Sequence, residues 1–149
     1  MNIDEIFDLL RWDKPEIMQQ KGITAAREIH NFYILIQPGY NKPVWDNCAL
    51  VVSEKSDDDL DPYVYRLLEW IKDLNWPGAG IILDRLKKMN TNILAGWFHC
   101  CARDALTLQD ESWLVNLIEL CENKELKQKI DPELYQKIVH FLEEMDKDE

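Results

Sequence analysis

Apolar residues recur every three or four positions along most of the chain, which is the spacing of helices that bury one side. The clearest example is the stretch 60–74, where they form one wide stripe. The alternation expected of β-strands is scarce. The run "NFYILIQP" at 31–38 is the one place that suits a strand, and it runs into Pro38-Gly39. The pattern therefore predicts an all-α protein.

Helix start signals divide this pattern into about eight helices. Asn2 with Glu5 has the form of a capping box, and Asp61 and Asp131 are each followed by a proline suited to a first helical turn. We interpret "SEKSDDDLDP" at 53–62 as a linker, and Gly22 as the mark of a close helix contact. The predicted helices lie at 2–10, 15–29, 44–52, 61–74, 77–89, 92–106, 110–121 and 131–145.

Helices of two to four turns joined by short corners cannot bury their apolar sides singly. Stacked as antiparallel pairs they can, which favours a short α-solenoid, with a globular helical bundle as the alternative. The 149 residues fit a single domain over 1–149, which we expect to close with a short acidic tail from about residue 143.

Composition and cysteine usage favour a cytoplasmic protein. No charged start followed by an apolar run and a cleavage site is present, and no apolar run approaches the length that spans a bilayer. The four cysteines form no C-x-x-C pair, and we expect them to be apolar fillers in a reducing compartment.

The charge balance bears on the kind of partner. Against 17 basic residues stand 28 acidic ones, for a formal net charge of -11, and most of the surplus lies in the last third of the chain. Such a surface repels phosphate backbones and speeds encounter with basic proteins. The charge argues against nucleic acid, although solubility is the better explanation of the charge taken by itself.

A group of residues around two tryptophans resembles a known family. They are Trp45, Asn47, Asp73, Asn75, Trp76, Pro77 and Gly78, the last five within the string "DLNWPGA". The string resembles the signature of a family of small bacterial proteins of unknown function with HEAT-repeat-like helical hairpins. The resemblance covers roughly residues 1–121, with "DESWLVNLIELC" as its weaker end, and implies a HEAT-like fold. Many proteins with such folds present stacked helices to a partner protein.

The string itself has two interpretations. Gly78 to Gly80 has the look of a phosphate cradle, but no strand precedes it and no Lys-Ser/Thr follows. We therefore predict a corner between two helices, with Pro77 at the first helical position and Asn75 capping ahead of it. Trp45 and Trp76 either line a groove or plug the core, and we expect the core.

Enzymatic chemistry is the competing hypothesis. The three histidines fall on separate predicted helices: His30, His99 and His140. No motif for a metal, a cofactor or a catalytic group is assembled, so we predict none of these. The alternative is a carboxylate site near Asp73, Trp76 and Asp84, such as that of a HEAT-like glycosylase-type hydrolase, with "RLKKM" at 85–89 as its only basic cluster.

The run Asp57, Asp58 and Asp59 is the candidate partner-binding segment. It lacks the EF-hand spacing for Ca²⁺, and a solvated linker is the simpler interpretation. Together these observations favour a protein-protein interaction module. A specific form of this hypothesis is an antidote that inhibits a basic partner such as a toxic nuclease. The sequence makes no prediction of oligomeric state.

Overall fold

The computed structural model describes residues 1–147 and is helical throughout, with no β-strand in that range, so the all-α prediction is confirmed. None of its helices is both long and apolar enough to cross a membrane. The α-helices are α1 (Ile3–Leu9), α2 (Glu16–Arg27), α3 (Trp45–Ser53), α4 (Asp57–Leu60), α5 (Val64–Trp70), α6 (Ala79–Lys87), α7 (Thr91–Leu108), α8 (Glu111–Leu120), α9 (Lys124–Lys129) and α10 (Pro132–Lys147). Short 3₁₀ segments are η1 (Phe32–Leu35), η2 (Lys42–Val44) and η3 (Asp61–Tyr63).

Side-chain caps explain where several helices begin. Asn2 accepts a hydrogen bond from the Glu5 N–H at 2.8 Å, as the capping pattern predicts. Asp110 accepts from the Trp113 N–H, and Asn90 accepts from two N–H groups in the first turn of α7. Each cap satisfies backbone donors that have no partner within the helix.

Two short helices were not predicted. The segment taken for a linker contains α4, which Ser56 caps through the Asp59 N–H, and it continues into η3. Asn123 caps α9 in the same way. Helices this short carry too few apolar positions for a periodic pattern, so only their caps were visible in the sequence.

Two other segments also differ from the predictions. The strand-compatible run forms η1, and the predicted second helix ends at Arg27. The acidic segment from 143 is not a separate tail up to Lys147, because it continues α10; residues 148 and 149 lie outside the described residues.

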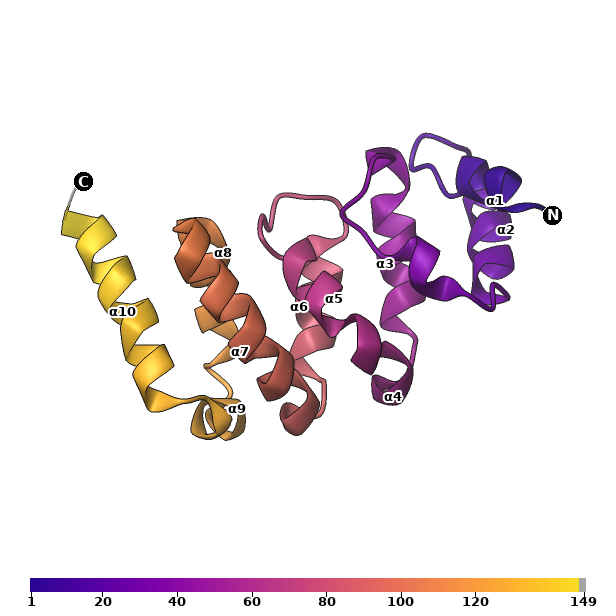
Figure 1. Ribbon diagram of the computed structural model, residues 1–149. Helices are drawn as coiled ribbons and strands as arrows, with labels where there is room; N and C mark the ends of the chain where they lie inside the picture. Colours follow the sequence, from indigo (N-terminus) through magenta and orange to yellow (C-terminus); the bar gives the residue numbers. More distant parts are fainter. Residues whose placement is uncertain (148–149) are drawn as a thin grey trace.

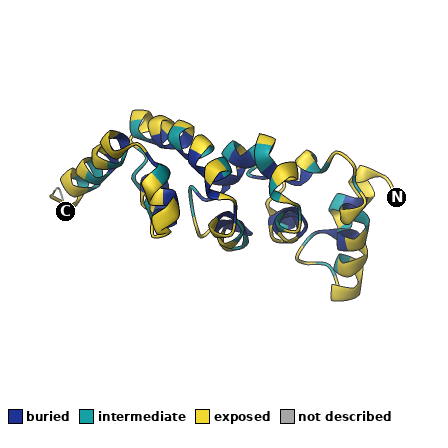
Figure 2. Ribbon diagram, turned by 90° about the horizontal axis from the view of Figure 1, so that it is seen from below, coloured by how far each residue is buried: buried dark blue, intermediate teal, exposed yellow. Residues whose placement is uncertain are grey.

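The helices stack in a curved row with the two chain ends far apart (Figure 1). Along the row α1 packs on α2, α3 on α6, α5 on α7, and α7 on α8, α9 and α10. Buried positions follow the inner sides of the helices from one end to the other (Figure 2). At the α1–α2 contact a Cβ on Gly22 would lie 2.8 Å from the Leu9 Cβ, so the close approach expected at Gly22 is confirmed.

Candidate functional site

Trp45, Trp76 and Gly78 meet where α3, α5 and α6 join. The ring of Trp45 packs edge-to-face on Trp76, with 5.8 Å between ring centroids, and on Trp70 at 6.5 Å. Trp45 and Trp70 are buried, and Trp76 is half-buried. The Trp70 indole N–H donates to the Pro77 carbonyl at 3.0 Å. Three aromatic rings thus pack together at this junction. Trp45 lies in the core as expected, whereas Trp76 is only partly buried and packs against the core.

Gly78 makes the junction possible. Its φ of 79° lies in the left-handed region, and a Cβ there would sit 2.7 Å from the Ala49 Cβ and 2.8 Å from the Trp45 carbonyl oxygen. Gly78 is also the N-cap residue of α6, which begins at Ala79. The prediction that Pro77 occupies the first helical position was therefore wrong, because the chain turns through the left-handed Gly78 before the helix starts.

The polar residues Asn47 and Asp73 form hydrogen bonds within the fold. The buried Asn47 amide donates to the Leu10 carbonyl at 2.7 Å and to the Gln19 side-chain oxygen at 2.9 Å, which joins α3 to α1 and α2. The Asp73 carboxylate accepts from the Asn75 N–H at 2.8 Å. The predicted capping of α6 by the Asn75 side chain was wrong, because Asp73 closes a local turn and Gly78 precedes the helix.

The residues of the enzyme hypothesis do not share the cavity in which Asp84 lies. That cavity, of about 530 Å³, is lined by Ser53, Asp57, Ile81, Asp84, Arg85 and Lys88. Asp73 accepts a hydrogen bond within the turn before α6. Trp76 packs on Trp45 near the start of α6, whereas Asp84 lies in its second half. The convergence that a carboxylate site requires is not present in this cavity.

Cysteine and metal chemistry gain no geometric support within residues 1–147. No group of three or more potential ligands there is placed to hold a metal ion. Cys48, Cys101 and Cys121 are buried, and burial raises the pKa of Cys48 to about 12 and that of Cys121 to about 11. Such thiols stay protonated near neutral pH and are weak nucleophiles.

The acidic run divides into one bound and two free carboxylates. Asp57 accepts from the Arg85 guanidinium at 2.6 Å and from the Asn90 N–H at 2.9 Å. Burial raises the pKa of Asp57, but these hydrogen bonds and the Arg85 charge outweigh it and hold the pKa below its ordinary value. Asp58 and Asp59 are exposed and form no ion pair within residues 1–147.

Sequence reasoning missed a groove beside this run. It has a volume of about 500 Å³ and lies between η3 and the first half of α7. Its lining residues are Asp61, Asn92, Ile93, Gly96, Trp97 and Cys100. The signal was present in the sequence, because Asn92, Gly96 and Cys100 recur at the four-residue spacing that places them on one side of a helix.

Comparison with known protein families shows which family includes this chain. A family model described as Domain of unknown function (DUF5071) matches residues 41–149. The chain belongs to this family. The match omits residues 1–40 and extends past 121, so the family region reaches further toward the C-terminus than the resemblance covered. The family's description states no activity, and searches of curated proteins and of solved structures returned no match.

Proposed function

We propose that this protein binds another, basic protein through the acidic surface of its helical stack. The supporting observation is that the cations are largely used within the molecule while the carboxylates are not. The ten ion pairs among residues 1–147 engage ten of the 17 basic side chains in that range, but only nine of its 26 acidic ones, because Glu69 takes part in two pairs. The remaining negative charge is available to a partner.

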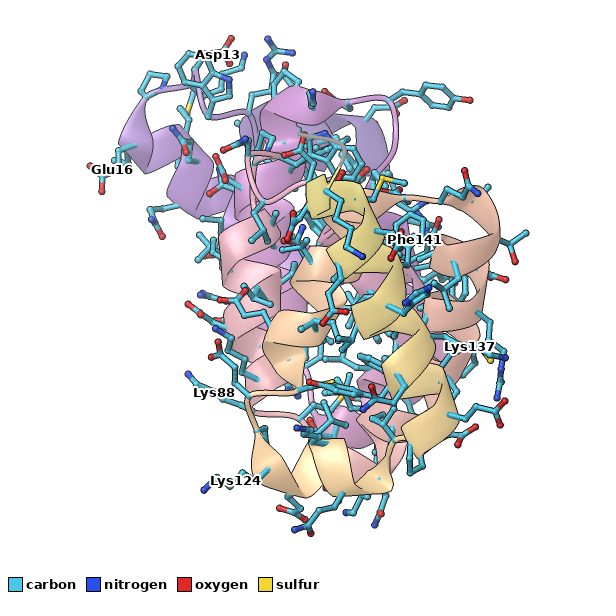
Figure 3. All side chains as sticks on the ribbon, turned by 90° about the vertical axis from the view of Figure 1, so that its left-hand side faces the viewer. Asp13, Glu16, Lys88, Lys124, Lys137 and Phe141 are labelled. Atoms are coloured by element: carbon cyan, nitrogen blue, oxygen red, sulfur yellow. The ribbon has the colours of Figure 1, made fainter. Side chains whose placement is uncertain are left out.

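The distribution of cations supports a protein partner over nucleic acid. Seen from the α10 end, Lys88 and Lys124 project from one edge of the stack and Lys137 from the other (Figure 3). The separation of Lys137 from the other two, together with the net negative charge, disfavours the continuous basic surface that phosphate backbones require.

The stacked helices support the HEAT-like description that the family resemblance implies, and with it a scaffold role. Such stacks present an extended surface rather than a closed catalytic pocket. The specific form of the proposal is an antidote that covers a basic toxin domain in the cytoplasm. Opposite charge would speed association of such a pair, and the rate would fall with added salt. A basic protein encoded next to this gene is the first partner to test.

The test is capture from native lysate with two charge-matched variants. Asp58→Asn/Asp59→Asn and Glu143→Gln/Asp146→Asn each remove two exposed negative charges, one pair from α4 and one from the end of α10. We expect wild type and the α10 variant to enrich the same basic protein, and the α4 variant to lose most of it. The partner is then purified, and its binding and its inhibition are measured at two salt concentrations.

Two results would contradict the proposal. One is enrichment of no basic protein by the wild-type chain. The other is a purified complex whose association rate does not change with salt, because encounter driven by opposite charge must weaken under screening.

A further inference from the structure

We propose that the groove between η3 and α7 binds an arginine side chain of a partner protein. The inference rests on the proposed function for its partner class and adds a defined site to it. The groove lies between the α4–η3 segment and α7, which two hydrogen bonds hold together. Asp57 accepts from the Asn90 N–H at one end, and the Trp97 indole N–H donates to Asp61 Oδ1 at 2.9 Å at the other.

The floor of the groove is an open glycine position. Gly96 lies in the middle of the 18-residue helix α7, where glycine is among the least favourable residues. A Cβ on Gly96 would meet nothing within 4 Å, whereas Gly22 and Gly78 each have a neighbour that leaves no room for a side chain. Neither packing nor backbone conformation therefore requires glycine here. Its effect is to leave space between Asn92, Ile93 and Cys100.

The charge of the groove is uncompensated. Its lining includes the Asp61 carboxylate and no basic side chain. Asp61 Oδ1 accepts from Trp97, and Oδ2 has no donor within residues 1–147. Asp58 precedes Asp61 by three positions in the continuous helical segment α4–η3, which places the two carboxylates on the same side. Arg85 of α6, which pairs with this segment, is occupied by Asp57 and the Lys55 carbonyl.

An arginine fits this combination better than other side chains. Its planar guanidinium can donate to Asp61 Oδ2 while lying against the Trp97 ring, and its stem can cover Ile93 and the open Gly96 position. Lysine offers a point charge without the planar stacking surface. A neutral isostere of arginine keeps the shape but loses the charge.

The experiment uses the full chain with ¹⁵N-labelled tryptophan and follows the Trp97 indole signal, assigned with Trp97→Phe. The probes are acetyl-Gly-Arg-Gly-amide, its lysine counterpart and its citrulline counterpart. We expect a saturable shift of the Trp97 signal with the arginine peptide, weaker binding of the lysine peptide, and no saturable shift with citrulline. Asp61→Asn, which retains an acceptor for Trp97, should weaken arginine binding about tenfold, the effect of one charge-assisted contact.

The second part of the experiment fills the groove with a larger side chain. Gly96→Leu should abolish the shift without loss of thermal stability, because leucine favours the helix and its Cβ meets no atom within 4 Å. Gly80→Leu is the matched control, since a Cβ there also meets nothing within 4 Å and Gly80 lies outside the groove. Equal responses to arginine and citrulline, or undiminished binding by folded Gly96→Leu, would overturn the inference.

The two proposals fail in different ways. If a captured basic partner binds Gly96→Leu as tightly as wild type, the proposal for the groove is rejected and the proposed function is retained. If the Trp97 signal shifts specifically with arginine but the chain captures no basic partner, the proposal for the groove is retained and the proposed function is rejected.

Discussion

Helices α3 and α8 each fasten the end of an earlier helix with a buried asparagine, and each carries a tryptophan two or three residues before it. In the α3 anchor, Asn47 donates to the carbonyl of Leu10, the C-cap residue of α1, and Trp45 lies nearby in the core. In the α8 anchor, Asn116 donates at 2.7 Å to the carbonyl of Ile71, the C-cap residue of α5. Both amides are buried and satisfy carbonyls that a helix leaves without partners.

The tryptophans of the two anchors differ. The Trp113 indole N–H donates to the Leu68 carbonyl at 2.9 Å, so this ring both packs and holds α5. The Trp45 indole N–H is buried without a hydrogen-bond partner among the described residues, and its ring packs between Trp70 and Trp76. The two tryptophans therefore differ, because Trp113 has a hydrogen bond to another helix and Trp45 contributes by packing without one.

The difference shows what each tryptophan ring depends on. A ring held only by packing depends on the shape of its neighbours, and Gly78 and Trp76 provide that shape. A ring held by a hydrogen bond depends on one carbonyl. The predictions that follow test this contrast, beginning with the largest effect.

Gly78→Ala should lower the free energy of unfolding by about 3 kcal/mol, because it combines left-handed strain with a clash against Ala49 and the Trp45 carbonyl. Urea unfolding followed by circular dichroism measures the change. Gly80→Ala is the control and should be neutral or stabilising, since its Cβ has open space. Equal effects of the two substitutions would show that the α3 anchor does not depend on close packing.

Asn47→Ala and Asn116→Ala should each cost about 2 kcal/mol, because each leaves a buried helix-terminal carbonyl without its donor. The anchors bind different helices, so the double variant should show the sum of the two losses. Chemical denaturation of all three variants measures this. A loss confined to one anchor would break the parallel between α3 and α8.

Trp113→Phe should destabilise the protein by about 1 kcal/mol more than Trp45→Phe. Both changes remove similar volume, but only the first leaves a carbonyl, that of Leu68, without its hydrogen bond. Unfolding midpoints of the two variants give the comparison. The reverse order would mean that the packing of the Trp45 ring contributes more than the hydrogen bond of Trp113.

The smallest effect concerns pH. The lowered pKa of Asp57 stabilises the fold fully above the ordinary carboxyl value of 3.8, and this contribution is lost as pH falls through the lowered pKa. Asp57→Asn should therefore show a weaker loss of stability than wild type on going from pH 5 to pH 2.5. The two asparagine anchors are neutral, so Asn47→Ala should leave the slope of stability against pH unchanged, which urea midpoints across this range can check.

The helical periodicity and the caps were sufficient to predict most of the fold. The caps at Asn2 and Asp110 act over a few residues, so the chain near them decides the outcome. The single helix predicted at 61–74 was too long, because the structure has η3 followed by α5, which ends at Trp70. The same local logic missed α4 and α9, whose few residues show no period. It also misplaced the start of α6, because the left-handed turn at Gly78 is set by contacts with Trp45 and Ala49 from another helix.

Functional placement was less predictable than the helices. The acidic run was visible in the sequence, but not that Arg85, 28 residues away, would occupy Asp57 and leave Asp58 and Asp59 free. Nor did the sequence indicate that Asp61 would meet Trp97 beside an open glycine, since 36 residues separate the pair. Such contacts depend on how helices pack, which no local pattern records.

The sequence by itself determined that the chain is helical, acidic and marked by a tryptophan-rich corner, because propensity, capping and charge are properties of neighbouring residues. Only the tertiary structure decided which carboxylates stay free, which tryptophan finds a hydrogen bond, and where a groove opens. The physical reason is that burial and pairing depend on distances between helices, and these are set by the packing of the whole stack.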